Sequence, residues 1–241
     1  MRGCRLLGNH RYRNPLEVHH VEGRTDLDRV DLVLASLPAW TKPTANKHRH
    51  SNLMIFSLFR RRPQVDTIST LYGMIVAQAR LPVFYRDYAV ADTVNGRFDL
   101  IVLHLALVLD RLAKDPASQS LGQGIFDRFC EDMDDNLREM GIGDIKVPKE
   151  MRRMGEAFYG RSKAYLSAIP AAMVPGDGSR ALIEALRRNI YGGAPSALAA
   201  APRLAAYILE AVRELKAQDI GTLMVGGLRF PDPAEIPPAI V

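Results

Sequence analysis

The sequence has no run of apolar residues long enough to cross a membrane. Its longest candidate, Leu100 to Leu109, contains His104 and is bounded by Asp99 and Asp110. A membrane-spanning helix needs about 20 mainly apolar residues. This segment is therefore predicted to be a buried helix of a globular domain.

Cysteine and the common catalytic motifs are scarce or missing. The 241 residues include only Cys4 and Cys130, which are too few and too far apart for a disulfide framework or a zinc pattern. A P-loop, a dinucleotide-binding glycine pattern, Gly-x-Ser-x-Gly and HExxH are also absent. No motif argues for an enzyme, so we expect no catalytic residue, no metal and no cofactor.

The positive net charge of +5 is concentrated near the start of the chain. Residues 1–53 contain nine Lys or Arg and five Asp or Glu, together with five of the six histidines and the only tryptophan. The rest of the chain is close to neutral, which gives no reason to expect a DNA partner. Two segments of different character therefore join near Met54.

These differences divide the chain into three parts. Residues 1–53 lack a sustained apolar period, so we expect them to be disordered, or to precede a true start at Met54; their acidic residues argue against a transit peptide. Residues 54–65 are apolar and basic, and Arg60, Arg61 and Arg62 could contact an anionic membrane surface or RNA, or form a solvated turn. Residues 66–241 are predicted to be one helical domain.

From Asp66 onward the apolar residues recur at helical spacing, and no run alternates as a half-buried strand would. The fold class is therefore all-α, with about six helices. The second helix is apolar on nearly every side, so the others should surround it. The third should end at Gly141. The expected helices cover approximately 66–81, 95–113, 120–140, 149–165, 179–191 and a segment from Pro195 or Pro202 to 217, with a loop at 81–93 and an extended tail from 218.

An acidic run on the third helix is the main candidate for a binding surface. Glu131 and Asp135 are one turn apart on the same side, and Asp132 and Asp134 lie between them. A solvated face, a docking surface for a basic partner and a metal site all stay open, although di-metal helical sites also use Glu-x-x-His, which is missing here. The candidate partner-binding residues are Glu131, Asp132 and Asp135, with Asp144 and Lys146 in the following loop.

His104 is the only histidine after residue 53 and lies within the most apolar helix. A lone imidazole there could be a base, a ligand or a hydrogen-bonded core group. No Ser, Cys or second His is one helical turn away from it. We therefore interpret His104 as a core group.

Two stretches, Leu71 to Leu112 and Phe126 to Tyr165, resemble the ubiquinol-cytochrome c chaperone family. The similarity covers about residues 66 to 215 and looks like that of a bacterial member. Its most specific pieces are Asp92-Thr93, Gly96-Arg97-Phe98, His104, the sequence LREMGIGD from Leu137 to Asp144, and Phe158-Tyr159-Gly160-Arg161.

The resemblance implies a non-enzymatic, all-helical assembly factor for ubiquinol-cytochrome c reductase that binds newly made cytochrome b. In mitochondria, members of this family act near the ribosome with a small helical partner, so both are candidate partners. The implied location is the cytoplasm or the inner face of the membrane, and mitochondria if the organism is eukaryotic. Two alternatives are an RNA-binding or membrane-surface module and a metal-dependent enzyme.

Overall fold

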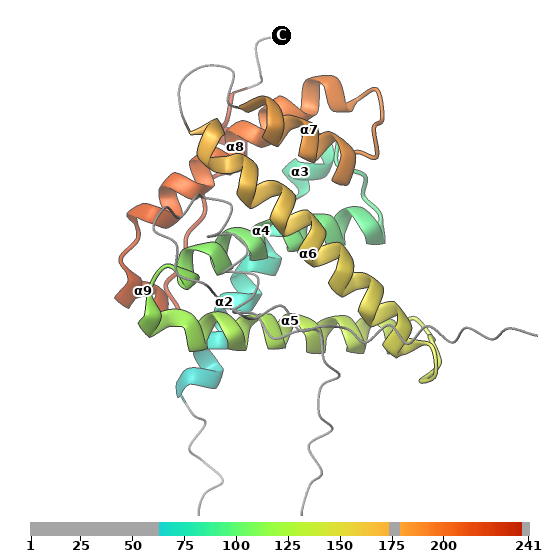
Figure 1. Ribbon diagram of the computed structural model, residues 1–241, viewed down its shortest axis with the longest axis vertical. Helices are drawn as coiled ribbons and strands as arrows, with labels where there is room; N and C mark the ends of the chain where they lie inside the picture. Colours follow the sequence, from blue (N-terminus) through green and yellow to red (C-terminus); the bar gives the residue numbers. More distant parts are fainter. Residues whose placement is uncertain (1–62, 174–178, 238–241) are drawn as a thin grey trace, which may run out of the picture.

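The computed structural model describes residues 63–173 and 179–237, and every regular element in these ranges is helical, which confirms the all-α prediction (Figure 1). Residues 1–53 and the predicted basic cluster Arg60, Arg61 and Arg62 lie outside these ranges. The elements are α2 (Pro63–Ala79), α3 (Pro82–Arg86), α4 (Val94–Ala113), η1 (Pro116–Ser118), α5 (Gln119–Glu139), α6 (Val147–Ala172), α7 (Arg180–Asn189), α8 (Ala197–Ala217), α9 (Ile220–Met224) and η3 (Pro233–Glu235).

Helix α4 lies at the centre of the fold, as its composition predicts. It packs against α2, α5, α6 and α8, and every residue from Asp99 to Leu109 is buried. In Figure 1, α5 runs along the lower edge, α6 crosses in front of α4, and α7 and α8 form the upper part. Since its neighbours cover α4 on all sides, this helix holds the middle of the hydrophobic core.

The apolar residues of this segment recur at helical spacing from Leu121 to Met140 and predict one buried stripe, which α5 buries except for its last member. Leu121, Ile125, Phe129, Met133 and Leu137 are buried. Met140 instead caps the helix and is 54% exposed, so its assignment to the stripe is wrong. Gly141 adopts a φ of +79°, and its N–H donates to the Arg138 carbonyl, which ends the helix where predicted.

The predicted loop at 81–93 contains a helix that sequence reasoning missed. Pro82 stops α2 from continuing and also lies in the first turn of α3. The first N–H groups of a helix have no partner within it, so proline, which lacks an N–H, is tolerated there. Val83 and Phe84 of this five-residue helix are buried against the core. Pro202 likewise lies inside α8, which begins at Ala197, so neither proposed proline is the first residue of that helix.

The segment after α8 has no long regular element, as predicted, but it packs onto the domain. Leu223 and Leu228 are buried. The Gln78 side chain donates to the Pro231 carbonyl at 3.2 Å, and the Tyr88 hydroxyl donates to the Pro233 carbonyl at 2.7 Å. The described part of the predicted tail is therefore attached to α2 and to the segment after α3.

The first turn of α4 is held by a loop that folds tightly against it. Thr93 is the N-cap, and its hydroxyl accepts a hydrogen bond from the Gly96 N–H at 3.1 Å. A Cβ atom on Gly96 would lie only 2.0 Å from the Ala91 carbonyl oxygen. Gly96 is therefore needed because the loop backbone occupies the space of a side chain.

We expect Gly96→Ala to lower the free energy of unfolding by about 1 to 2 kcal/mol, because the exposed loop must shift away from the new methyl group. Gly73→Ala is the matched control: Gly73 is an exposed position inside α2 with nothing within 4 Å of an added Cβ. It should be stabilising by up to about 1 kcal/mol. Urea unfolding of both variants checks this, and equal effects at the two positions would contradict it.

Candidate functional site

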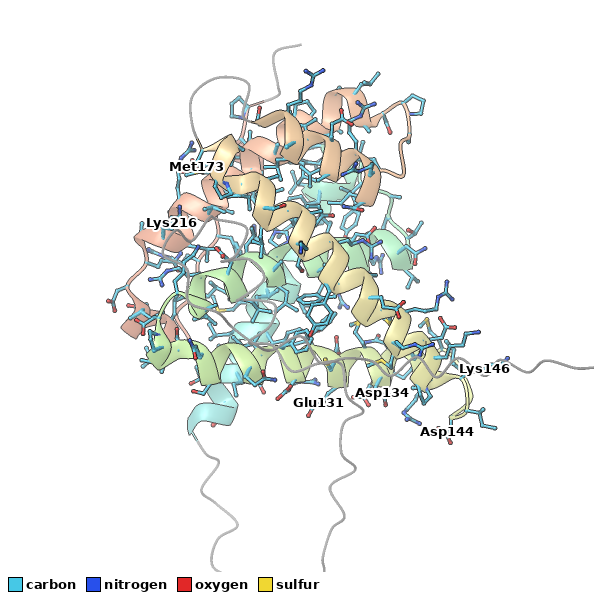
Figure 2. All side chains as sticks on the ribbon, viewed as in Figure 1. Glu131, Asp134, Asp144, Lys146, Met173 and Lys216 are labelled. Atoms are coloured by element: carbon cyan, nitrogen blue, oxygen red, sulfur yellow. The ribbon has the colours of Figure 1, made fainter. Side chains whose placement is uncertain are left out.

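The acidic face of α5 and the charged turn that follows it lie along one edge of the molecule (Figure 2). Glu131 is 66% exposed, with its carboxylate 3.6 Å from the Arg128 guanidinium, and Asp135 is also exposed. Such exposed pairs contribute little to stability. Glu131 and Asp135 are therefore free to contact another molecule at little cost to the fold.

Asp132 occupies a different environment from its neighbours. Its carboxylate accepts a hydrogen bond of 2.7 Å from the hydroxyl of Tyr72, a buried residue of α2. Burial, with the Asp132 hydrogen bond as a second cause, raises the pKa of Tyr72, so the phenol stays protonated and donates. Asp132 thus links α5 to α2, whereas Glu131 and Asp135 face outward.

The turn between α5 and α6 combines charged and exposed apolar side chains. Arg138 bonds the Asp134 carboxylate at 2.5 Å and also bonds Asp144, so it connects the helix to the turn. Ile145 is 96% exposed, beside the exposed Lys146. Figure 2 places Asp144 and Lys146 at the end of the edge that carries Glu131 and Asp134. The structure therefore brings the predicted site residues onto one edge, with Asp132 turned inward.

His104 is a fully buried and hydrogen-bonded core residue. Its Nδ1 lies 2.8 Å from the Leu100 carbonyl, which can only accept, so the proton is on Nδ1. Its Nε2, 2.8 Å from the Tyr207 hydroxyl, accepts from that group. Burial lowers the pKa of His104 to about 4. Its contacts are those of the core group that the sequence indicates, and neither ring nitrogen is free to act as a base.

Asp99 and Arg161 form an ion pair between α4 and α6. The Arg161 guanidinium lies 2.9 Å from Asp99 Oδ1 and 5.5 Å from the centre of the Phe98 ring. The contact is close but poorly aligned, and Asp99 Oδ1 receives no hydrogen bond from the described residues. Burial outweighs the nearby arginine and raises the pKa of Asp99 to about 6. Arg161 therefore has a structural role.

The described residues offer neither a metal site nor a membrane-spanning helix. Within residues 63–173 and 179–237, no three His, Cys, Asp or Glu side chains lie close enough together to hold a metal ion. In the same ranges no helix has both the length and the apolar character needed to span a membrane. Burial raises the pKa of the Cys130 thiol to about 12, which keeps it in its unreactive protonated form.

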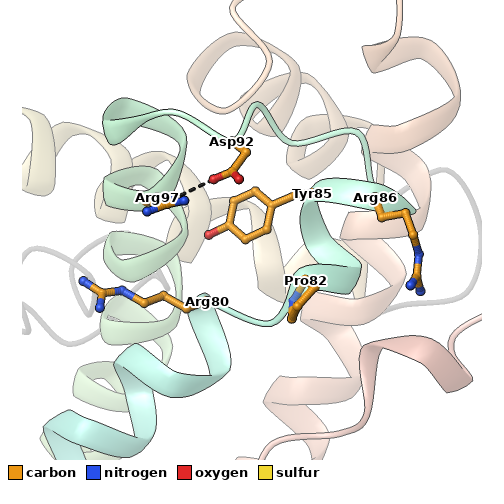
Figure 3. A pocket seen from close by; sticks show the side chains of 6 residues that line it. All are labelled: Arg80, Pro82, Tyr85, Arg86, Asp92 and Arg97. Carbon is orange, nitrogen blue, oxygen red and sulfur yellow. Dashed lines mark hydrogen bonds and ion pairs between the residues drawn. The ribbon is translucent and has the colours of Figure 1, made fainter.

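An open cleft of about 550 Å³ lies between the end of α2, α3 and the start of α4 (Figure 3). Arg97 bonds Asp92 at 2.7 Å, and both side chains are 55% exposed. Asp92 and Arg97 belong to the sequence pieces that resemble the chaperone family, but the sequence alone predicts no role for either side chain. The lining side chains are Arg80, Pro82, Tyr85, Arg86, Asp92 and Arg97.

Comparisons with known proteins agree on one family. The sequence model of the family described as "Ubiquinol-cytochrome C chaperone" matches residues 86–230. The crystal structure of the Cbp3 homolog from Brucella abortus is 37% identical in sequence and superimposes with a TM-score of 0.64, over 76% of this chain and all of that one. A search of curated proteins gave no match. The family match includes the α4 core, the acidic edge and the α6–α8 helices, and the chain therefore belongs to the ubiquinol-cytochrome c chaperone family.

Proposed function

We propose that this protein assists the assembly of ubiquinol-cytochrome c reductase by binding newly made cytochrome b, without catalysing a reaction. Membership of the chaperone family is the observation that carries the proposal. His104 and Cys130 are poor candidates for catalysis, because both ring nitrogens of His104 are hydrogen-bonded inside the core and the Cys130 thiol stays protonated.

We assign the contact with cytochrome b to the charged edge formed by α5 and its following turn. Glu131 and Asp135 supply negative charge, and Met140 and Ile145 supply exposed apolar surface beside Asp144 and Lys146. A client segment with basic residues next to apolar ones fits this combination. Electrostatic attraction would guide the encounter, and burial of the apolar side chains would hold the complex.

A deletion strain tests the assembly role. Loss of the gene should lower the amount of assembled reductase while cytochrome b messenger RNA stays unchanged, and the wild-type gene should restore assembly. Blue native gels and cytochrome spectra give the readout. Normal reductase levels in the deletion strain would refute the proposed function.

Reversing the charges of Glu131 and Asp135 tests whether the α5 edge contacts cytochrome b. The double variant Glu131→Lys with Asp135→Lys should reduce the cytochrome b that co-purifies from mildly solubilised membranes by about tenfold, because two like-charge contacts replace two attractive ones. Glu184→Lys with Glu210→Lys reverses two charges on α7 and α8 and serves as the control. Equal capture by the two double variants would remove the α5 edge from the proposal and leave the family-based role in place.

A further inference from the structure

The cleft beside Tyr85 contains more positive than negative charge. Three arginines line it, against one lining carboxylate, Asp92. Arg86 is paired with Asp87 at 2.6 Å. Figure 3 shows Arg86 pointing away and Arg97 beside the Tyr85 ring, on the side toward which the hydroxyl points, whereas the exposed Arg80 side chain begins near that hydroxyl and extends outward. Arg80, Arg97 and Tyr85 therefore form the side of the cleft with unbalanced positive charge.

Arg86 and Arg97 each have a carboxylate partner. Among the described residues, Arg80 has no carboxylate within ion-pair distance. Arg97 has one partner, Asp92, in a half-exposed pair whose stability contribution is small. Because a guanidinium presents several N–H donors, Arg97 can keep Asp92 and still donate to a second anion. The two arginines thus offer donors to a ligand with several oxygens.

Tyr85 and Pro82 give the cleft a firm, partly apolar floor. The Tyr85 hydroxyl donates to the Ala79 carbonyl at 3.0 Å, which fixes the ring against the end of α2. Burial raises the pKa of Tyr85, so it carries no competing negative charge. The loop that places Asp92 is held by the close approach of Ala91 to Gly96. The cleft is therefore built from fixed elements, and its volume lies within the range of small-ligand sites.

We propose that this cleft binds a phosphate group beside Tyr85, held by Arg97 and by Arg80 once its exposed side chain turns toward the ligand. Phosphate oxygens match the fork geometry of arginine. A nucleic-acid backbone needs many such contacts for useful affinity, and the near-neutral body of this chain does not supply them. The phosphate belongs to a small soluble molecule or to an anionic lipid headgroup. This inference does not depend on the cytochrome b proposal.

Binding of two probes tests it on the full chain at constant ionic strength. Inorganic phosphate is measured by calorimetry, and vesicles of phosphatidylcholine with or without phosphatidylglycerol are measured by co-sedimentation. We expect saturable binding of at least one probe. Binding of phosphate alone identifies a soluble ligand as the source, and binding restricted to phosphatidylglycerol vesicles identifies a lipid headgroup.

Four variants decide whether the cleft is responsible. Arg80→Gln and Arg97→Gln should each weaken binding about tenfold, and Asp92→Asn should strengthen it, because the competing carboxylate is removed. Arg213→Gln is the control, since it removes the same charge from an exposed ion pair on α8. Absence of saturable binding, or equal weakening by the control, would overturn the proposal. Unfolding curves of all four variants verify that each is folded.

Discussion

Lowering the pH from 6.5 to 4 should remove about 3 kcal/mol of stability through His104 alone. The folded protein holds the pKa of this imidazole at about 4, against an ordinary value of 6.5, because the ring is buried. Between these pH values the unfolded chain binds a proton that the folded chain does not. Stability is therefore fully present above pH 6.5 and is lost as the pH falls toward 4.

The titration of Asp99 changes the stability in the opposite direction to that of His104, over nearly the same pH range. Its pKa is raised from 3.8 to about 6, so the folded chain holds a proton that the unfolded chain has released. The stability from Asp99 is fully present below pH 3.8 and is lost as the pH rises through 6. The contributions of His104 and Asp99 to stability therefore partly cancel. The pH dependence of wild-type stability would not show either contribution separately.

Two variants separate these contributions. Asp99→Asn should make the loss of stability on acidification steeper than in the wild type, and His104→Gln should make it shallower. Urea unfolding at a series of pH values between 4 and 7 measures both differences. If His104→Gln does not fold, the Asp99→Asn profile still decides the Asp99 part, and a wild-type slope in that variant would contradict it.

Replacing Tyr207 by Phe should lower the free energy of unfolding by about 2 to 3 kcal/mol. The Tyr207 hydroxyl accepts a hydrogen bond from Gln78 at 3.0 Å and donates to His104 Nε2 at 2.8 Å. Without the hydroxyl, the buried nitrogen of His104 has no donor, and an unpaired buried acceptor costs about 1 to 3 kcal/mol. Gln78 keeps its contact with the Pro231 carbonyl.

Tyr165→Phe is a close control for this substitution. Tyr165 is also a fully buried tyrosine, but its hydroxyl only approaches the Asn189 side chain and makes no hydrogen bond of good geometry among the described residues. Removing that oxygen should be neutral or slightly stabilising, because the group no longer has to be desolvated. Thermal and urea unfolding compare the pair, and an equal loss of stability in both variants would show that ring packing, not the hydrogen bonds, is responsible.

The long helices could be predicted because their apolar residues follow a 3.6-residue period. Helix α4 illustrates this, since residues buried on every side leave a continuous apolar run in the sequence. The five-residue α3 could not be found in this way, because it is shorter than two turns and Pro82 signals both an end and a start. The attachment of the tail to α2 also has no local signal, since its hydrogen bonds join residues far apart in the chain.

The site residues also divide into those with a local sequence signal and those whose placement depends on distant residues. The exposure of Glu131 and Asp135 follows from helical spacing alone, whereas the inward turn of Asp132 depends on Tyr72, which is 60 residues away. Likewise, the central position of His104 was evident from its helix, but its partner Tyr207 lies 103 residues further on. The cleft is lined by Arg80, which follows α2, and by Arg97 of α4, and no spacing rule predicts that these two residues share a cleft.

The attachment of the C-terminal segment to α2 determines when the fold can be completed during synthesis. Pro231, whose carbonyl accepts from Gln78, lies 153 residues later in the chain. Helices α2 and α3 therefore leave the ribosome long before the segment that covers them exists. A nascent chain stopped before residue 231 lacks the carbonyls that accept from Gln78 and Tyr88, so these two side chains gain their last partners only late in translation.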